Sequence, residues 1–358
     1  MNPIESTIRN TLILTVSAWR QRVVGLLIGN AFVWLPVLVY QNLSYYQVFL
    51  SDWTQRTLIY LAISYSLYAL FFYSLASPAR IETTHSRLSF IALKKIGLGI
   101  WNFVIFGPKD YTHRLVVLNK FEKRALLFGA VKFFFVPMML NFLYSNYNAF
   151  SGQLAGLDSL SVLFTIEGFN SLLFPLLFTL FILIDVVFFA FGYLFEAGFL
   201  ANRVRSVEPT VIGWAVALIC YPPFNTMFIG YTNWYASDYP NASSSTLTFI
   251  LRLLVLVFMG IYASASVALG PKASNLTNRG IVDYGPYRFV RHPAYTFKNL
   301  AWWVSIIPIF SPAAFFSMFI WSFIYFMRAI TEERHLMRDP DYQTYCKKVQ
   351  YRFIPKVV

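Results

Sequence analysis

The side chains best suited to chemistry lie in two short stretches of the C-terminal third of the chain. Residues 285–295 read GPYRFVRHPAY and supply arginines, a histidine and tyrosines. Residues 328–336 read RAITEERHL and supply two adjacent glutamates between arginines. Cations and carboxylates placed together can bind a polar, zwitterionic molecule, because charge-assisted hydrogen bonds form at both of its ends. Such groups are costly near a bilayer unless they are paired or used, so the two stretches predict a polar pocket.

The segment between these stretches must bring them together. Residues 299–327 are mostly apolar, but they are too many for one snug span and too few for two full ones. Pro308 and Pro312 lie in the middle of this segment, which is typical of a turn. We therefore predict two helices, at about 293–309 and 313–331, that form a tight hairpin. Both ends of the hairpin, and the two stretches with them, are expected to project into the cytosol.

The composition of the whole chain indicates a membrane protein. Of its 358 residues, 57% are hydrophobic and only 13% are charged, whereas soluble domains have about 45–50% and about 25%. That surplus of apolar side chains requires the bilayer as a second solvent, and each span needs roughly 20 apolar residues. The sequence therefore predicts an all-α polytopic membrane protein with about eight transmembrane helices. Besides the C-terminal hairpin, the predicted spans are residues 23–43, 57–77, 125–144, 171–201, 210–230 and 247–269.

The distribution of basic residues predicts the orientation of the chain. If the N-terminus lies in the cytosol and the spans alternate, the cytosolic segments hold 26 of the 29 lysines and arginines. This asymmetry fits the positive-inside rule, so both termini are predicted to be cytoplasmic. The net charge of +13 then reflects topology, and the expected partners are membrane lipids rather than nucleic acid.

One polar segment and four isolated charges differ from the apolar character of the predicted spans. Residues 78–124 interrupt their apolar parts with Lys94 and Lys95, which predicts amphipathic pieces lying along the inner leaflet. The nine basic residues of this segment either attract anionic lipid or only fix the topology. Charges in or near spans either have a function or pair to lock helices together. These charges are Lys132, Asp185, Glu196 and Arg252.

Taken together, the two chemical stretches resemble a known superfamily. Gly-Pro-Tyr-Arg-x-Val-Arg-His-Pro-x-Tyr, then Arg-x-x-x-Glu-Glu-x-x-Leu, then Tyr-x-x-Tyr before Ile-Pro, is similar to the isoprenylcysteine carboxyl methyltransferase and phospholipid methyltransferase superfamily. The resemblance covers about residues 275–355. It implies a methyltransferase-like membrane core at 206–358 and leaves residues 1–205 as a membrane module of unknown role. It also implies S-adenosylmethionine as the cofactor, bound in a pocket open to the cytosol, and a lipid-like acceptor that enters from the bilayer.

The resemblance further implies roles for individual residues. His292 and Tyr295 are expected to contact the cofactor, and Arg291 to shape the loop. One of Glu332 and Glu333 is expected near the ammonium of the cofactor's methionine part. Arg291 and Glu333 are the expected catalytic residues, and Glu333 or a water would receive the proton of an ammonium acceptor. The predicted cofactor-binding residues are Arg288, His292, Tyr295, Arg328, Glu332 and Glu333.

One position departs from the family pattern. The family usually has glycine two positions after the motif tyrosine, whereas this chain has Phe297. A large side chain there narrows the space that glycine leaves for a cofactor or a neighbouring helix. The adjacent Lys298 either attracts an anionic acceptor or extends to the membrane interface, as lysines commonly do.

Other interpretations stay open at this point. Membrane sterol reductases share Arg-His-Pro-x-Tyr and a tail close to that at 342–355, and they use NADPH to reduce a double bond. A scaffold or transporter built on the N-terminal helices needs no catalytic pocket. His292 can also simply anchor a helix start, and the two glutamates can simply pair with neighbouring arginines. The sequence contains no glycine-rich phosphate loop and no spacing of metal ligands, so no metal is predicted.

Overall fold

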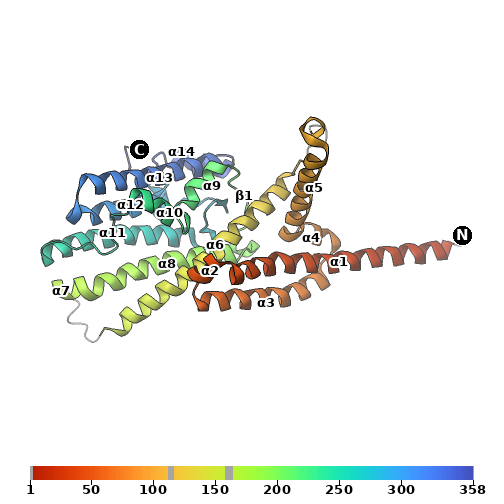
Figure 1. The fold of residues 1–358 in the computed structure, drawn as a ribbon, viewed down its shortest axis with the longest axis horizontal. Coiled ribbons are helices and arrows are strands. Elements are labelled where there is room, and N and C mark those ends of the chain that lie inside the picture. Colours follow the sequence, from red (N-terminus) through yellow and green to blue (C-terminus); the bar gives the residue numbers. More distant parts are fainter. Residues whose placement is uncertain (1–2, 112–116, 158–163, 358) are drawn as a thin grey trace. The chain divides into compact units, whose positions relative to one another are not determined.

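The computed structural model describes residues 3–111, 117–157 and 164–357, and the side chains of 16–105, 117–157 and 164–357. Helices account for 77% of the chain (Figure 1). The long helices are α1 (Pro3–Asn42), α3 (Asp52–Leu75), α5 (His85–Tyr111), α6 (Lys120–Ala155), α8 (Phe174–Leu194), α11 (Ser245–Leu269) and α13 (Pro312–Leu336). The shorter α-helices are α2 (Ser44–Phe49), α4 (Pro78–Glu82), α7 (Ile166–Gly168), α9 (Val211–Leu218), α10 (Phe224–Thr232), α12 (Pro293–Ser305) and α14 (Pro340–Lys348). The remaining elements are the π-helical turn η3 (Phe169–Leu173), the 3-10 turns η4 (Gly198–Leu200), η5 (Gly270–Lys272), η6 (Gly285–Arg288) and η7 (Ile307–Ile309), and the strands β1 (Ser206–Val207) and β2 (Thr277–Asn278).

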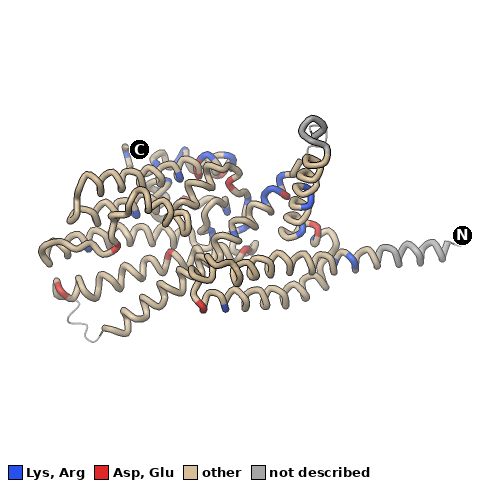
Figure 2. Tube along the Cα trace, in the orientation of Figure 1, with Lys and Arg blue, Asp and Glu red and all other residues tan. Residues whose placement is uncertain are grey.

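The chain forms two compact units, Met1–Asn141 and Phe142–Val358. In the first unit, α1 packs against α3, α4 and α5. In the second unit, α11 packs against α8 and α12, and α13 packs against α9 and α12. Lysines and arginines of the second unit gather around the end of α13 and along α14 (Figure 2). The two chemical stretches both lie in this unit, and the predicted functional division at residues 205/206 stays a prediction.

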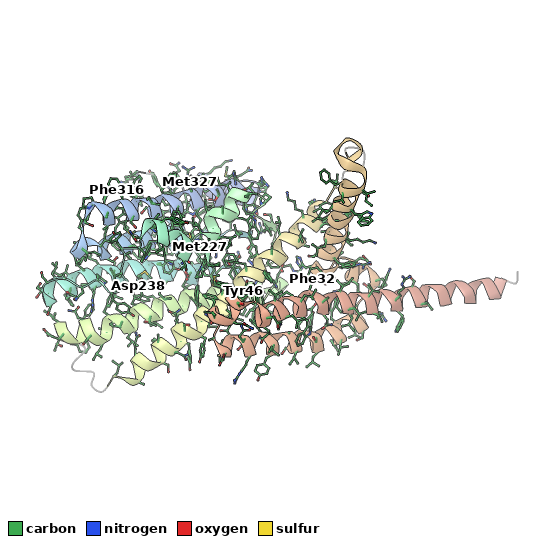
Figure 3. All side chains as sticks on the ribbon, viewed as in Figure 1. Phe32, Tyr46, Met227, Asp238, Phe316 and Met327 are labelled. Atoms are coloured by element: carbon green, nitrogen blue, oxygen red, sulfur yellow. The ribbon has the colours of Figure 1, made fainter. Side chains whose placement is uncertain are left out.

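Large apolar side chains cover the outside of the helices. Phe316 on α13 and Met227 on α10 are 63% and 65% exposed (Figure 3). An apolar surface of this extent indicates contact with lipid, and the expected all-α multi-pass membrane protein is confirmed. Seven of the described helices are long and apolar enough to cross a membrane, namely Val16–Asn42, Asp52–Leu75, His85–Ile105, Lys120–Ala155, Ile166–Leu194, Ser245–Lys272 and Pro312–Leu336.

The end of α8 holds a loop that lines the candidate site. Gly192 lies so close to this loop that an added Cβ would come within 2.1 Å of the Ala273 carbonyl oxygen. The next residue, Tyr193, is fully buried, and its hydroxyl oxygen accepts a hydrogen bond from the Asn275 backbone N–H at 2.6 Å. Helix α8 therefore fixes the backbone of the loop 273–275.

Replacing Gly192 with alanine is expected to destabilise the second unit, because the added methyl group pushes the loop away from α8. Overpacking of this kind typically costs about 1–3 kcal/mol. Thermal unfolding of the purified chain in detergent micelles measures the loss. Gly230→Ala is the matched control, since nothing lies within 4 Å of a Cβ built at Gly230. Equal unfolding midpoints for the two variants would contradict the close contact at Gly192.

The C-terminal hairpin forms, with helix ends that differ from those predicted. Helix α12 begins at Pro293 and α13 begins at Pro312, where the missing N–H of proline leaves no helical hydrogen bond unmade. The Ser311 hydroxyl caps the first turn of α13. Helix α12 ends at Ser305 rather than 309, so it is only about 20 Å long. Helix α13 continues to Leu336 rather than 331, so the second chemical stretch is entirely helical.

The prediction of one span at 210–230 is wrong. The structure has two short helices there, because α9 ends at Leu218 and α10 begins at Phe224. Pro222 and Pro223 lie between them, and proline interrupts a helix since it lacks an N–H and crowds the preceding turn. The break allows α9 to pack against α13, where it forms a wall of the candidate site.

The predicted position of residues 78–124 along the inner leaflet stays a prediction. Helix α5 continues without a break through Lys94 and Lys95. Lysine is a good helix former, and its long side chain can extend away from apolar surroundings. By length and composition, residues His85–Ile105 are also long and apolar enough to cross a membrane.

The isolated charges in or near the spans contact neighbouring groups. Ser266 on α11 donates a hydrogen bond to Asp185 on α8. Glu196 accepts a backbone N–H at 2.8 Å, and the Nε of Arg252 donates to a backbone carbonyl at 2.9 Å. The Lys132 ammonium in the first unit lies 5.0 Å from the centre of an aromatic ring. The contacts of Asp185 and Arg252 join separate segments of the second unit, which favours the helix-locking role over a chemical one for these two residues.

Candidate functional site

The two chemical stretches meet at the end of α13. His292 Nε2 lies 3.1 Å from Glu333 Oε1, so the hairpin brings the first stretch against the second as predicted. Strands β1 and β2 pair antiparallel at Ser206 and Asn278, and the Ser206 hydroxyl lies 2.8 Å from His335 Nε2 on α13. The site is therefore built from three separate parts of the second unit: the β1–α9 segment, the loop before β2, and the hairpin.

Glu333 is the centre of an ionic cluster. Its Oε1 accepts a hydrogen bond from Arg291 Nε at 2.7 Å, and its Oε2 accepts one from Arg352 Nε at 2.8 Å. Burial lowers the pKa of Arg291, but the bonded carboxylate raises it more, so this pKa lies above its ordinary value. We refer to Arg291, His292, Glu333 and Arg352 as the Glu333 cluster.

The Glu333 cluster fastens the C-terminal tail to the start of α12. The backbone N–H of Arg291 donates to the Tyr351 carbonyl at 2.9 Å, and that of His292 donates to the Arg352 carbonyl at 2.9 Å. The Arg291 guanidinium also donates to two further carbonyls of the tail. The tail is thus held by backbone and side-chain hydrogen bonds at the same place.

A cavity of about 40 Å³ lies beside the Glu333 cluster. Its walls come from α9, from the loop 274–277, from Tyr295 on α12 and from α13. The α13 residues that line it are three or four positions apart, which places them on one face of the helix. These residues are Arg328, Thr331, Glu332, His335 and Leu336.

Arg328 supplies a buried cation to the cavity. The residue is only 7% exposed. It donates a hydrogen bond to the Asn275 side-chain oxygen, and its guanidinium carbon lies 5.0 Å from the centre of the Tyr295 ring. No carboxylate of the described residues lies within 4.0 Å of its guanidinium nitrogens. Since a buried cation is unfavourable without a directly bonded carboxylate, Arg328 is a candidate for binding an anionic group of a ligand.

Glu332 supplies the opposite charge. The Tyr295 hydroxyl donates to Glu332 Oε2 at 2.7 Å. The Tyr295 ring is stacked on His292, with ring centres 5.4 Å apart and an angle of 4° between the planes. Because Glu333 holds His292, the Glu333 cluster positions Tyr295 and, through its hydroxyl, the Glu332 carboxylate.

The predicted site residues therefore fall into three groups. Tyr295, Arg328 and Glu332 line the cavity. The predicted Arg291, His292 and Glu333 belong to the Glu333 cluster and are not among the lining residues. Arg288 lies apart from both groups, because it is exposed and its guanidinium carbon lies 4.5 Å from the centre of an aromatic ring.

The position that departs from the family pattern is filled by packing. The ring of Phe297 lies 6.0 Å from that of Phe258, within the aromatic core between α8, α11 and α12. The Lys298 ammonium lies 5.2 Å from the centre of the Tyr262 ring and 5.4 Å from that of Trp302. Lys298 is therefore held between aromatic rings rather than extended to the interface.

Sequence reasoning missed several residues of the cavity. Glu208, Asn275 and His335 line it, yet none was predicted as a site residue. Glu208 reaches the site because β1 pairs with β2, and strands of two residues leave no periodic pattern to recognise. The only signal at Glu208 is an isolated carboxylate just before a helix, which is too common to predict a site.

Comparison with known families supports one class of function. Residues 247–339 match the family model described as phospholipid methyltransferase. The match confirms the resemblance predicted for the C-terminal third. It includes Tyr295, Arg328 and Glu332, but not Glu208 or α9. No curated protein matches the chain. The match supports a membrane methyltransferase as the kind of function.

Proposed function

We propose that the chain is an integral membrane methyltransferase that uses S-adenosylmethionine and acts on a lipid-like acceptor at the cytosolic face. The observation that carries this proposal is the cavity with Arg328 and Glu332 on one helix face, inside the region that matches phospholipid methyltransferases. Neither feature alone would be sufficient, because charged cavities are common and the match covers a quarter of the chain.

The charged groups of the cavity fit the methionine part of this cofactor. Arg328 can bond the carboxylate through its two-pronged guanidinium, and Glu332 can accept hydrogen bonds from the ammonium. The two residues are four positions apart on α13, so they are neighbours on the helix surface. This suits a carboxylate and an ammonium attached to one carbon atom. When bound, the cofactor supplies a sulfonium-linked methyl group that needs no further activation.

The cavity is smaller than a typical small-molecule pocket, so binding of the cofactor requires a change in its walls. Its volume is about 40 Å³, whereas small-molecule pockets typically have about 300–1,000 Å³. Binding of a nucleoside-containing cofactor therefore requires the walls to move apart. Helix α9 lies opposite the face of α13 and is joined to it by side-chain contacts, whereas the loop 273–275 is fixed on α8, so α9 is the segment expected to move.

The residues around the cavity have mainly positioning roles in this proposal. Both oxygens of Glu333 already accept hydrogen bonds from arginines, which makes this carboxylate a poor proton acceptor. Arg291 is likewise occupied by Glu333 and the tail. We assign both to holding His292 and Tyr295 in place rather than to proton transfer. The cavity residues then align the reacting groups and exclude water.

The surface of the second unit supports the cytosolic placement and the lipid-like acceptor. Basic side chains gather around the end of α13 and along α14 (Figure 2), and such residues favour the cytosolic side. The cavity lies at the same end of α13. The helices leading to it expose apolar side chains such as Phe323 and Phe326, which are 54% and 40% exposed. An acceptor with an apolar tail can therefore reach the cavity while it stays in the membrane.

The test is transfer of label from radioactive methyl-S-adenosylmethionine. The full-length chain is reconstituted into liposomes made from a total lipid extract, and the label in the organic phase is followed over time. We expect steady accumulation of label in lipid-soluble material. Asp341→Asn is the matched control that keeps activity, because Asp341 is exposed and contacts Arg205 away from the cavity.

The alternatives give different results in the same preparation. Oxidation of NADPH without transfer of label would contradict the proposal and favour a sterol-reductase-like enzyme. Absence of both reactions, in protein that stays folded in the liposomes, would favour a scaffold or transporter.

Removing the Tyr295 hydroxyl tests how Glu332 is positioned. Tyr295→Phe keeps the ring beside Arg328 and His292 but loses the hydrogen bond to Glu332. A hydrogen bond to a charged group contributes about 1.5–3 kcal/mol, so we expect the product S-adenosylhomocysteine to bind about tenfold more weakly. Isothermal titration calorimetry in detergent micelles measures the affinity. Unchanged affinity would contradict the role given to this hydroxyl.

A further inference from the structure

Glu208 carries a buried carboxylate oxygen without a hydrogen-bond partner. The residue is 2% exposed and lies just before α9. Its Oε1 accepts a hydrogen bond from the Thr210 backbone N–H at 2.9 Å and lies 3.4 Å from an Arg334 nitrogen. Its Oε2 has no hydrogen-bond partner among the described residues, and His335 Nδ1 is 4.0 Å away. Because Glu208 also lines the cavity, this free oxygen belongs to the site.

The local structure is shaped to hold this side chain. A Cβ added to Gly213, in the first turn of α9, would lie 2.4 Å from Glu208 Cγ, so the glycine leaves the room that Glu208 occupies. The Trp214 Nε1–H donates to the Glu208 backbone carbonyl at 2.8 Å. A buried acceptor without a partner is unfavourable. That it is nevertheless fixed at the wall of a cavity indicates that a ligand supplies the donor.

Glu208 faces α13 at the level of His335, and this level indicates which part of a ligand Glu208 would contact. Arg328 and His335 are seven residues apart, which is about 10 Å along the helix axis. Arg328 lies at one end of the lining, Glu332 lies between, and Glu208 faces the other end beside His335. A ligand whose carboxylate is held by Arg328 reaches Glu208 with groups that lie roughly 10 Å from that carboxylate. In S-adenosylmethionine, the first hydrogen-bond donors beyond the sulfur are the ribose hydroxyls.

We propose that Glu208 Oε2 accepts hydrogen bonds from the two neighbouring ribose hydroxyls of the methyl donor, an inference that rests on the proposed function. A carboxylate offers only acceptors, and acidic residues bind ribose hydroxyls in the same way in dinucleotide-binding folds. Glu332 is then left for the ammonium. Glu208 is a specificity residue for the nucleoside part of the ligand.

The test combines a variant of the protein with a variant of the ligand. Binding of S-adenosylhomocysteine and of its 2′,3′-dideoxy analogue is measured by calorimetry on the full chain and on Glu208→Gln. The glutamine keeps an Oε1 for the Thr210 N–H but replaces the free acceptor with a donor. We expect the wild type to bind the dideoxy analogue about tenfold or more weakly than S-adenosylhomocysteine, and Glu208→Gln to bind both equally weakly. The two losses are then not additive, as required for groups in direct contact.

The other outcomes distinguish a failure of this inference from a failure of the proposed function. If the wild type binds S-adenosylhomocysteine but the losses from the variant and the analogue add, Glu208 does not contact the hydroxyls and this inference alone fails. If the wild type binds neither ligand, the proposed function fails and the inference with it. Gly213→Ala, which displaces Glu208 without changing it, is expected to give the same selective loss. Asp283→Asn, at an exposed ion pair with Lys348, is the control that leaves both affinities unchanged, and thermal unfolding confirms that each variant is folded.

Discussion

Replacement of Arg328 with alanine is expected to weaken the binding of S-adenosylhomocysteine by about 100-fold or more and to remove methyl transfer. Truncating one partner of a buried, hydrogen-bonded charge pair typically costs about 2–5 kcal/mol, and a factor of ten corresponds to about 1.4 kcal/mol. Arg328 is buried and has no carboxylate partner within 4.0 Å among the described residues. A ligand carboxylate would be its directly bonded counter-charge, and the ligand loses this anchor when the guanidinium is removed.

The comparison with Arg328→Lys makes this prediction specific. Lysine keeps the positive charge but not the planar pair of donors, so we expect an affinity between those of the wild type and of alanine. Calorimetry gives the affinities, and thermal unfolding in the absence of ligand shows whether the variants fold. Wild-type affinity in a folded Arg328→Ala variant would show that the ligand carboxylate is bound elsewhere.

Replacement of Glu333 with alanine is expected to destabilise the protein by about 3 kcal/mol and to release the C-terminal tail. Removing one partner of a buried ion pair costs about 3–5 kcal/mol, because the remaining charge is left uncompensated. Here Arg291 loses its carboxylate while its side chain is only 9% exposed. Arg352 is 40% exposed, and its contribution is therefore reduced by solvent, which sets the expectation at the lower end of the range.

The neighbouring glutamate provides the matched control. Glu332 accepts its hydrogen bond from the neutral Tyr295, so Glu332→Ala is expected to lose ligand binding with little loss of stability. Limited proteolysis distinguishes the two variants, because only Glu333→Ala should expose the tail after α14 to cleavage. Equal stability and equal protease resistance of the two variants would contradict the fastening role of the Glu333 cluster.

The meeting of the two chemical stretches could be predicted because it depends on local signals. The apolar run is too long for one span, and the prolines near Ser311 mark a turn, so a hairpin is the simplest structure. The helix ends could not be predicted to the residue. Helix α13 extends to Leu336 because the turns that carry the glutamates are held by contacts with α9, α12 and the tail, and these contacts come from other parts of the chain.

The different roles of the two glutamates follow from helix geometry but not from the sequence alone. Successive residues on an α-helix point about 100° apart, so Glu332 and Glu333 point in different directions, and of the two only Glu332 lines the cavity. Which of them does so is decided by the positions of Arg291 and Arg352, and Arg352 reaches Glu333 only because the tail folds back. The sequence therefore predicted the pair and left its division open.

The positions of Glu208 and α9 could not be predicted from local sequence patterns. The prediction treated 210–230 as one apolar span, although Pro222 and Pro223 lie within it. Because the helix is interrupted there, α9 is a separate short helix that packs against α13 and covers the cavity. That arrangement depends on the β1–β2 pairing, in which segments far apart in the chain exchange only a few hydrogen bonds. Strands this short have no hydrophobic periodicity from which the pairing could be predicted.

The most direct measurement is an experimental structure of the full chain with S-adenosylhomocysteine. We expect the ligand to lie between α9 and α13, with its carboxylate on Arg328, its ammonium on Glu332 and α9 moved away from α13. A ligand bound elsewhere in the second unit, with no contact to Arg328, would contradict the proposed site.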